Sequence, residues 1–144
     1  DNGIVVLEYV KGDLLRDLLM KIDESKACEL AFTMGKYAAI LHKNNIVHGD
    51  LTTSNAIYTG KELYLIDFGL ADYSNDIEDM GVDVHLFLRS IESTFWKYSS
   101  YLYKCFLDGY EEILGKDYVN KIKEKVHEIR LRGRYVIERK VKVR

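Results

Sequence analysis

Three side chains that could serve in phosphoryl transfer are closely spaced in the middle of the chain. Asp50 and Asn55 belong to the segment HGDLTTSN at 48–55, and Asp67 belongs to YLIDFG at 64–69. Moving a phosphoryl group from ATP requires an oriented acceptor and neutralised phosphate charge more than covalent help. Asp50 can orient the acceptor, while Asn55 and Asp67 offer the hard oxygen ligands that Mg²⁺ prefers. These residues predict magnesium-dependent transfer from ATP.

The elements around these residues agree with that chemistry. The turn at 59–61, Thr-Gly-Lys, precedes a strand-like run at 63–66, so Asp67 is expected at the end of a short β-hairpin. The alternative is structural: Asp50 caps a turn, Asn55 lies in a loop, and Asp67 is an acidic strand end. The combined order and spacing favours the functional interpretation, because a motif gains weight from its structural context.

Helical periodicity predicts most of the remaining elements. Apolar residues at four-three spacing predict a helix over about 25–43, which would deliver the loop containing Asp50. Further helices are expected at about 76–97, 99–114 and 117–130, and Asn75 with Glu78 suggests a capping box at the start of the first of these. The apolar positions of the helix at 25–43 are Ala27, Ala31, Met34, Ala38 and Leu41.

With these motifs in place, the chain resembles the C-terminal lobe of the protein-kinase-like superfamily. The resemblance implies an α+β, mainly α-helical fold with a hinge strand and a short β-hairpin that carries the catalytic and DFG loops. Residues 1–10 are expected to be the last strand of the N-terminal lobe and the hinge, 11–130 the C-terminal lobe, and 131–144 a basic tail.

The same resemblance implies that the N-terminal lobe is largely absent from this chain. The phosphate-covering loop, its strand Lys and the helix Glu that pairs with it cannot be placed, since Lys11 and Lys21 follow the hinge. Asp1-Asn2-Gly3 is typical of a hairpin turn whose earlier strand would precede the chain.

The resemblance also assigns site roles residue by residue. In VVLEYVKG at 5–12, Leu7 stands at the gatekeeper position and the backbone of Glu8 and Val10 would bind the adenine edge, with Ile57 beneath the ring. On residue types alone, an ordinary buried strand with an acidic turn would be the favoured interpretation of this segment, and the downstream motifs favour the hinge instead. Structural support of the site is implied for four residues: His48, Phe68, Gly69 and Asp83.

Departures from ordinary protein kinases narrow the resemblance. Gly49 stands where Arg usually precedes the catalytic Asp, Thr52 replaces the usual Lys, and no APE string follows a short segment after Gly69. Regulation through a phosphorylated activation loop is therefore not expected. The stretch IEDMGVDVHLFLRS at 77–90 and the tail beginning RLRGR are similar to the small atypical kinase or ATPase subunit of the KEOPS complex.

This narrower resemblance implies a role, cofactors and partners. It implies an atypical Ser/Thr kinase or ATPase that uses ATP and Mg²⁺, with a Ser or Thr hydroxyl or water as acceptor. It also implies support of threonylcarbamoyladenosine modification of transfer RNA, beside a threonylcarbamoyl transferase, separate or fused, and other KEOPS subunits. Two alternatives remain: a small-molecule phosphotransferase of the aminoglycoside or choline kinase type, disfavoured by the short segment after Gly69, and a non-catalytic scaffold.

Composition adds limits rather than a function. Hydrophobic residues make up 47%, charged residues 31%, and the formal net charge is −2. With no apolar run of about 18 residues and no signal-peptide pattern, we expect a cytoplasmic protein without a membrane span. Cys28 and Cys105 lack metal or redox spacing and are interpreted as reduced thiols, with a disulfide as the alternative that no sequence pattern favours. The other histidines show no ligand spacing, so a zinc site is not predicted: His42, His85 and His127.

Positive charge is concentrated at the end of the chain. Residues 121–144 contain ten Lys and Arg against three Glu, a net charge of +7 in a chain of −2 overall. Clustered cations release counterions from nucleic-acid phosphates, so this tail is expected to contact transfer RNA. The resemblance implies contact with the transferase partner as well. A solvated helix face, a strand edge or a disordered arm are alternatives. The candidate contacts are Arg130, Arg132, Arg134, Arg139 and Lys140.

Overall fold

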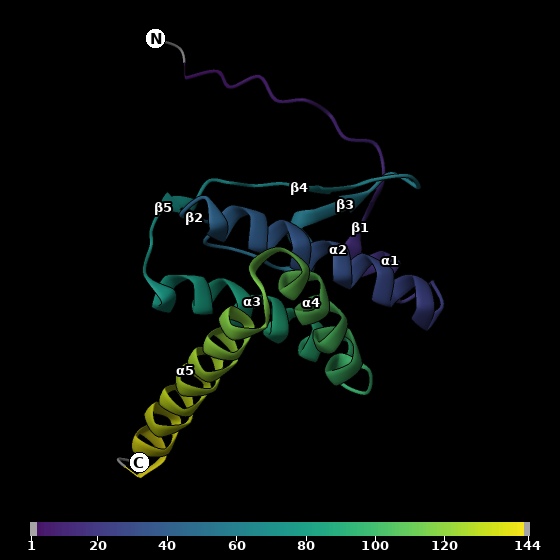
Figure 1. Cartoon of the computed structure of the whole chain (residues 1–144). Helices are drawn as coiled ribbons and strands as arrows, with labels where there is room; N and C mark the ends of the chain where they lie inside the picture. Colours follow the sequence, from purple (N-terminus) through teal and green to yellow (C-terminus); the bar gives the residue numbers. More distant parts are fainter. Residues whose placement is uncertain (1–2, 143–144) are drawn as a thin grey trace.

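The computed structural model describes residues 3–142, and these residues are mainly helical (Figure 1). Three helices, α2, α3 and α4, pack together beneath two small sheets, and α5 extends away from them toward the C-terminus. The elements in chain order are β1 Asp13–Leu14, α1 Leu15–Leu18, α2 Glu24–Lys43, β2 Ile46–Val47, the 3₁₀ helix η1 Thr53–Asn55, β3 Ala56–Tyr58, β4 Leu63–Leu65, β5 Asp72–Tyr73, α3 Ile77–Phe95, α4 Ser99–Leu114 and α5 Lys116–Lys142.

Helices α2 and α4 approach each other closely because each has a glycine at the crossing. A Cβ atom on Gly35 would lie 1.9 Å from the carbonyl oxygen of Phe106, and one on Gly109 would lie 2.0 Å from that of Phe32. Only glycine fits at both positions, since any side chain would collide with the backbone of the facing helix. This contact fixes α4 against the helix that leads into the predicted catalytic loop, residues 48–55.

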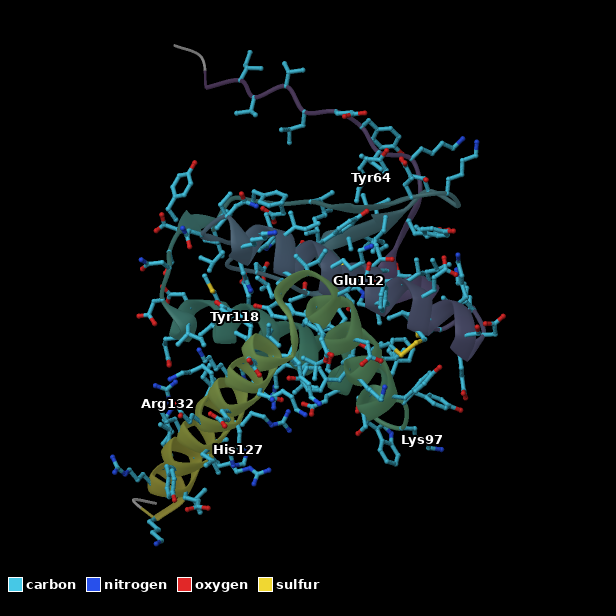
Figure 2. The ribbon with its side chains drawn as sticks, viewed as in Figure 1. Tyr64, Lys97, Glu112, Tyr118, His127 and Arg132 are labelled. Carbon is cyan, nitrogen blue, oxygen red and sulfur yellow. A yellow bond between two sulfur atoms is a disulfide. The ribbon has the colours of Figure 1, made fainter. Side chains whose placement is uncertain are left out.

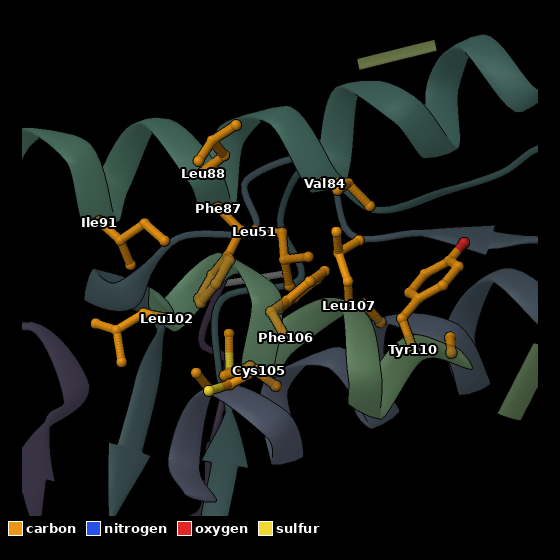
Figure 3. Packing of buried hydrophobic residues seen from close by; sticks show 14 of the residues in the cluster. Leu51, Val84, Phe87, Leu88, Ile91, Leu102, Cys105, Phe106, Leu107 and Tyr110 are labelled. Carbon is orange, nitrogen blue, oxygen red and sulfur yellow. The ribbon is translucent and has the colours of Figure 1, made fainter. Parts of the chain in front are cut away.

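The core between α3 and α4 is aromatic and aliphatic (Figure 3). The rings of Phe87 and Phe106 stack with centroids 4.4 Å apart, and Tyr110 is fully buried beside them. Leu51, in the catalytic loop, is also fully buried in this core. Because buried apolar area is the main source of stability, the loop is anchored by the same packing that joins the helices.

Two small antiparallel sheets hold the segments of the site. In the first, β3 lies between β1 and β4, with Ala56 opposite Leu65 in the β3–β4 hairpin. In the second, β2 pairs with β5, so that Val47 lies opposite Asp72. The second pairing brings the segment after Gly69 back alongside the strand that precedes the catalytic loop.

The predicted helices and the predicted hairpin are present. Helix α2 matches the expected 25–43, α4 matches 99–114, and α3 matches 76–97 to within two residues. The N-cap of α3 differs from the prediction: Asp76, rather than Asn75, accepts a hydrogen bond from the Glu78 N–H. Either residue type can cap a helix, and the backbone conformation selected the second.

The C-terminal prediction was too short. Helix α5 continues through residue 142, so the described part of the expected tail, 131–142, is neither a strand edge nor a disordered arm. All of its side chains are exposed, including the apolar Tyr135, Ile137 and Val141. The residues 117–130 and the basic segment after them therefore form one continuous helix.

The strand expected within residues 1–10 is not formed among the residues that the structure describes. Residues 3–12 run as extended chain without a sheet partner, and five apolar side chains there are 78–90% exposed. A strand requires a neighbour to accept its backbone hydrogen bonds, and residues 3–12 have none here. The hairpin turn expected at Asp1-Asn2-Gly3 falls mainly outside the described residues.

The interpretation of the cysteines was wrong. Cys28 of α2 and Cys105 of α4 form a disulfide, with Cα atoms 5.4 Å apart. The two residues are 77 positions apart in sequence, so no local pattern could pair them, and the α2–α4 crossing brings them together. Within residues 3–142, none of the helices is long and apolar enough to cross a bilayer.

Candidate active site

The catalytic loop leaves α2 through a tight reversal. Asn45 adopts a left-handed conformation with φ of 56°, which Asn tolerates better than most residues. Its carbonyl oxygen accepts a hydrogen bond from the Ser74 N–H at 2.9 Å. The chain then passes through β2 into His48, Gly49 and Asp50, with the β2–β5 pairing holding this entry in place.

Asp83 of α3 fastens the loop from below. It is 1% exposed, and its carboxylate accepts hydrogen bonds from the His48 N–H at 2.8 Å and the Gly49 N–H at 2.9 Å. The same carboxylate lies 2.9 Å from Nε2 of the buried His42. A buried carboxylate is costly unless its oxygens are satisfied, and these donors satisfy both oxygens. The support role expected for Asp83 stays a prediction, which these hydrogen bonds favour.

His48 joins the two motif segments. Its Nε2 lies 2.9 Å from the carbonyl oxygen of Ile66, and its Nδ1 lies 3.2 Å from the backbone nitrogen of Asp50. The partners define the tautomer, since a carbonyl only accepts and an N–H only donates. The imidazole also packs against Phe68, with ring centroids 4.7 Å apart. His48 therefore braces the residues on either side of Asp67 against the catalytic loop.

Asp50 and Asn55 are held together directly. The Asn55 amide nitrogen donates to Oδ2 of Asp50 at 2.8 Å and to its backbone oxygen at 2.9 Å. Because the amide nitrogen is engaged in this way, the amide oxygen is the group that Asn55 can offer to a metal ion. The Ile66 N–H donates to the Asn55 carbonyl at 3.0 Å, which places Asn55 beside the residue that precedes Asp67.

Asp67 occupies an unusual backbone conformation. Its φ is 58°, in the left-handed region, and Oδ1 accepts a hydrogen bond from the Gly69 N–H at 3.3 Å. Non-glycine residues in this region cost free energy and are concentrated at functional sites. The side chain of Asp67 is exposed, as is the Phe68 ring at 47%, so the carboxylate is accessible to a ligand.

The structure around Gly49 accounts for the absence of the Arg that usually precedes the catalytic Asp in ordinary protein kinases. Its φ is 84°, and a Cβ atom there would lie 2.3 Å from the carbonyl oxygen of Leu70. A side chain at this position is disfavoured both by the backbone conformation and by the close approach. The short segment after Gly69 thus passes directly over the position where an Arg side chain would begin.

The four candidate adenine contacts do not lie together in the described structure. Leu7 is 82% exposed, and Glu8 is exposed in the same extended segment. Val10 is half-buried, and Ile57 is half-buried in β3, paired with Leu14 and Tyr64. In Figure 1 residues 3–10 run apart from the helices. The four residues therefore do not form one binding surface in this structure.

The basic residues of the tail fall into two groups. Arg130 donates to Glu92 of α3 at 2.7 Å, and Arg132, which is labelled in Figure 2, donates to Glu78. The hydrogen bond from Arg132 lowers the pKa of the Glu78 carboxyl, although both groups are partly exposed. By contrast, three of the candidate contacts lie on the fully exposed part of α5: Arg134, Arg139 and Lys140.

Two residues that sequence reasoning missed, His42 and Tyr110, lie beneath the loop at 48–55. His42, interpreted as an ordinary helix residue, is 2% exposed and contacts both Asp83 and the hydroxyl of Tyr110. One signal was present: His42 follows Ala38 by four residues and so extends the apolar stripe of α2. A histidine on a buried face needs polar partners, but only the tertiary structure could identify them.

The donor set fits Mg²⁺ only together with a phosphorylated ligand. Asn55 and Asp67 provide one amide oxygen and one carboxylate, and residues 3–142 contain no group of three or more His, Cys, Asp or Glu side chains able to hold a metal ion. Mg²⁺ in nucleotide sites commonly takes one or two protein ligands, with phosphate oxygens and water completing its shell. The side chains present match that pattern.

The chain is similar to known proteins over most of its length. Residues 1–96 match the family described as the protein kinase domain. The chain is similar to the KEOPS complex subunit Bud32 of Pyrococcus abyssi, with 45% identity over 134 residues, covering 93% of this chain and 61% of the relative. It is also similar to a probable serine/threonine-protein kinase BUD32 homolog of Archaeoglobus fulgidus, with 35% identity over 94% of this chain and 64% of the relative.

A third relative is much longer. A probable bifunctional tRNA threonylcarbamoyladenosine biosynthesis protein of Methanothermobacter thermautotrophicus is 38% identical over 94% of this chain but only 23% of its own length. The chain thus spans about three-fifths of the shorter relatives and about a quarter of the bifunctional one. All three matches include the catalytic loop, Asp67 and most of α5, because they cover over nine-tenths of the chain.

Proposed function

The chain belongs to the protein kinase domain family, and from that premise we propose that it forms the catalytic half of a magnesium-dependent ATP phosphotransferase or ATPase. Asp50 orients the acceptor and takes its proton, and the acceptor is a Ser or Thr hydroxyl or water. Asn55 and Asp67 are the metal ligands. The observation that carries the proposal is the pair of hydrogen bonds from the Asn55 amide nitrogen to Asp50.

These hydrogen bonds do two things at once. They orient the carboxylate of Asp50, and they leave the amide oxygen of Asn55 for a metal ion. A catalytic base must be positioned before its basicity matters, and here the base and a metal ligand position each other. A scaffold requires neither a fixed carboxylate nor an amide oxygen left free for a metal ion, so this geometry favours the enzymatic interpretation.

The second ligand is supplied by a strained turn. Asp67 keeps a left-handed backbone while its neighbours are held by His48 through Ile66 and Phe68. Bound magnesium would neutralise the phosphate charge that develops during transfer. Because His48, Asn55 and Ile66 are connected by hydrogen bonds, the positions of Asp50 and Asp67 are coupled through the protein itself.

The nucleotide base would contact the beginning of the chain. We assign the adenine edge to the backbone of Glu8 and Val10, with Leu7 at the gatekeeper position and Ile57 beneath the ring. Residues 1–10 would then be the last N-terminal-lobe strand and the hinge, 11–130 the C-terminal lobe, and 131–144 the basic extension.

The cellular role follows from the relatives. One similar protein is named as a KEOPS subunit and another as a probable bifunctional biosynthesis protein for threonylcarbamoyladenosine in tRNA. We propose that this protein acts in the same modification in the cytoplasm, beside or fused to a threonylcarbamoyl transferase. The exposed Arg134, Arg139 and Lys140 would contact transfer RNA or that transferase.

The test is a set of carboxylate substitutions in the full-length protein. Asp50→Ala and Asp67→Ala should each reduce magnesium-dependent ATP turnover by about 10³-fold or more, because both groups act on the reacting phosphate or acceptor. Asp108→Ala is the matched control, since Asp108 is an exposed carboxylate of α4 whose single ion-pair partner within residues 3–142 is Lys104. Phosphate release is measured with protein purified free of other ATPases.

The outcomes separate the alternatives. Loss of turnover in both site variants, with circular dichroism and melting unchanged and with Asp108→Ala active, supports the assignment. Wild-type turnover in either site variant would refute it and favour a scaffold. Phosphorylation of an added aminoglycoside or choline in preference to protein hydroxyls would instead favour a small-molecule phosphotransferase.

A further inference from the structure

A buried chain of polar groups runs from α4 to the catalytic loop. The Tyr110 hydroxyl lies 2.8 Å from Nδ1 of His42, and Nε2 of His42 lies 2.9 Å from Oδ2 of Asp83. The same oxygen accepts the His48 N–H, and Oδ1 accepts the Gly49 N–H. Three helices therefore converge on two backbone groups directly before Asp50.

The hydrogen atoms in this chain can be assigned from the partners. The Asp83 carboxylate can only accept, so Nε2 of His42 must donate to it. Burial raises the pKa of Tyr110 well above its usual value, with smaller contributions from Tyr118 and Asp83, so its hydroxyl stays protonated at neutral pH. Tyr110 can then donate to Nδ1 while Nε2 donates to Asp83, so that His42 is held at both ring nitrogens.

This arrangement resembles the support of metal-bound histidines, where a partner on one nitrogen fixes the tautomer and the ring orientation at the other. Here the oriented group is the Asp83 carboxylate rather than a metal. Asp83 can hold two catalytic-loop amides only while its own oxygens keep their direction. The Tyr110 hydroxyl is the group in this hydrogen-bonded series that is farthest along it from the loop. It lies in the α2–α3–α4 core, away from the exposed site.

We propose that Tyr110 is a positioning residue for the catalytic loop, acting through His42 and Asp83 on the backbone of His48 and Gly49. Its contribution to ATP turnover rests on the proposed function, whereas its effect on the two loop amides does not. The geometry thus makes α4, which supplies none of the proposed site residues, a determinant of where Asp50 stands.

The experiment removes one oxygen atom. Tyr110→Phe keeps the ring that packs with Phe106 and Tyr118 but leaves Nδ1 of His42 unpaired. In the full-length protein, residue-resolved amide exchange measured by NMR should become roughly tenfold faster at His48 and Gly49. The kcat for ATP turnover should fall by about tenfold while the KM for ATP changes little, as is typical when outer supports of a site are lost.

Tyr118→Phe is the matched control. Tyr118 lies beside Tyr110 and is also partly buried, but its hydroxyl donates to the Met80 sulfur and has no link to His42. Removing that hydroxyl should leave exchange at His48 and Gly49 and the kcat unchanged. Equal effects of the two substitutions would overturn the proposal, because they would indicate a packing role shared by both rings.

Further outcomes are decisive whether or not the protein turns over ATP. Unchanged exchange at both loop amides in Tyr110→Phe would overturn the inference, as would acceleration spread evenly over α2 and α4. If Tyr110→Phe does not fold, the ¹⁵N shifts of the His42 ring in the wild-type protein decide the matter. A hydrogen-bonded Nδ1 supports the inference, and an Nδ1 without a hydrogen bond overturns it.

Discussion

Charged residues occur both in the buried network of Tyr110, His42 and Asp83 and in outer α5, residues 131–142. They are buried and hydrogen-bonded in the network but exposed in outer α5. Asp83 is 1% exposed and accepts hydrogen bonds from three residues. The side chains of residues 131–142 are all exposed, and Arg134, Arg139 and Lys140 lie on that surface. Hydrogen bonds fix the position of the Asp83 carboxylate in the buried network. In outer α5, by contrast, the charged side chains lie on a helix that extends from the other helices (Figure 1).

The difference matches what each region is proposed to do. Orienting an acceptor hydroxyl requires defined geometry, because small misplacements of a reacting group reduce rates strongly. Attraction of a polyanion requires charge density and tolerates motion, because phosphate contacts carry little sequence information. Substitutions should therefore affect stability and activity together beneath the loop, but affinity alone in outer α5.

The largest effect is expected from Asp83→Ala. The substitution leaves His42 and two loop N–H groups without their acceptor, so the free energy of unfolding should fall by about 3–5 kcal/mol, as for other broken buried polar pairs. Denaturant unfolding monitored by circular dichroism measures the change. Asp79→Ala, on the exposed side of α3, is the control and should cost far less. A loss below 1 kcal/mol for Asp83→Ala would remove the contrast between the two regions.

The next effect concerns the disulfide that joins α2 to α4. Replacing Cys28 and Cys105 by Ala should lower the free energy of unfolding by about 2–4 kcal/mol, since the bond restricts the unfolded chain across 77 residues. Unfolding is compared with and without a reductant. Reductant should destabilise the wild-type protein and leave the double variant unchanged. Equal stability of the oxidised and reduced wild type would show that glycine-mediated packing alone holds the crossing.

A smaller effect is expected from Gly49→Ala. The methyl group would meet the Leu70 carbonyl and require a left-handed alanine, at a cost of about 1–3 kcal/mol. Since Gly49 precedes Asp50, turnover should fall as well. Gly60→Ala is a matched control, because Gly60 also has a positive φ but nothing within 4 Å of its Cβ position. Full activity of Gly49→Ala would show that the loop can shift without losing function.

The smallest effect on folding is expected in outer α5. Changing Arg134, Arg139 and Lys140 to Gln should alter stability by less than about 0.5 kcal/mol. It should weaken transfer RNA binding and make the slope of log affinity against log salt shallower by about two to three. Filter binding over a range of salt concentrations measures both.

The paired arginines of α5 provide the control for that measurement. Arg130 and Arg132 already contact Glu92 and Glu78, so converting both to Gln should change the salt slope less per charge than the outer substitutions. An unaltered slope with lost transferase binding would make outer α5 a protein-docking surface. An unaltered slope with intact partner binding would leave these residues as a solvated helix face.

Much of the site could be predicted because its signals are local. Asp50 and Asn55 are five residues apart, and Asp67 follows a hairpin whose turn and strands are visible in the sequence. The helices at 24–43, 77–95 and 99–114 were predicted to within about two residues because amphipathic periodicity reports which face is buried. The end of α5 was missed, since Gly133 is a weak helix former and the exposed segment has little packing signal.

What the sequence by itself determined is therefore the order and spacing of the candidate side chains, and the short elements that present them. Only the tertiary structure decided what holds them. The contacts of His42 with Asp83 and Tyr110, and the bond between Cys28 and Cys105, join residues 41, 68 and 77 positions apart. Such pairs leave no periodic trace in the chain, because helix and strand patterns record burial but not the partner, and the crossing of α2 with α4 selects the partners.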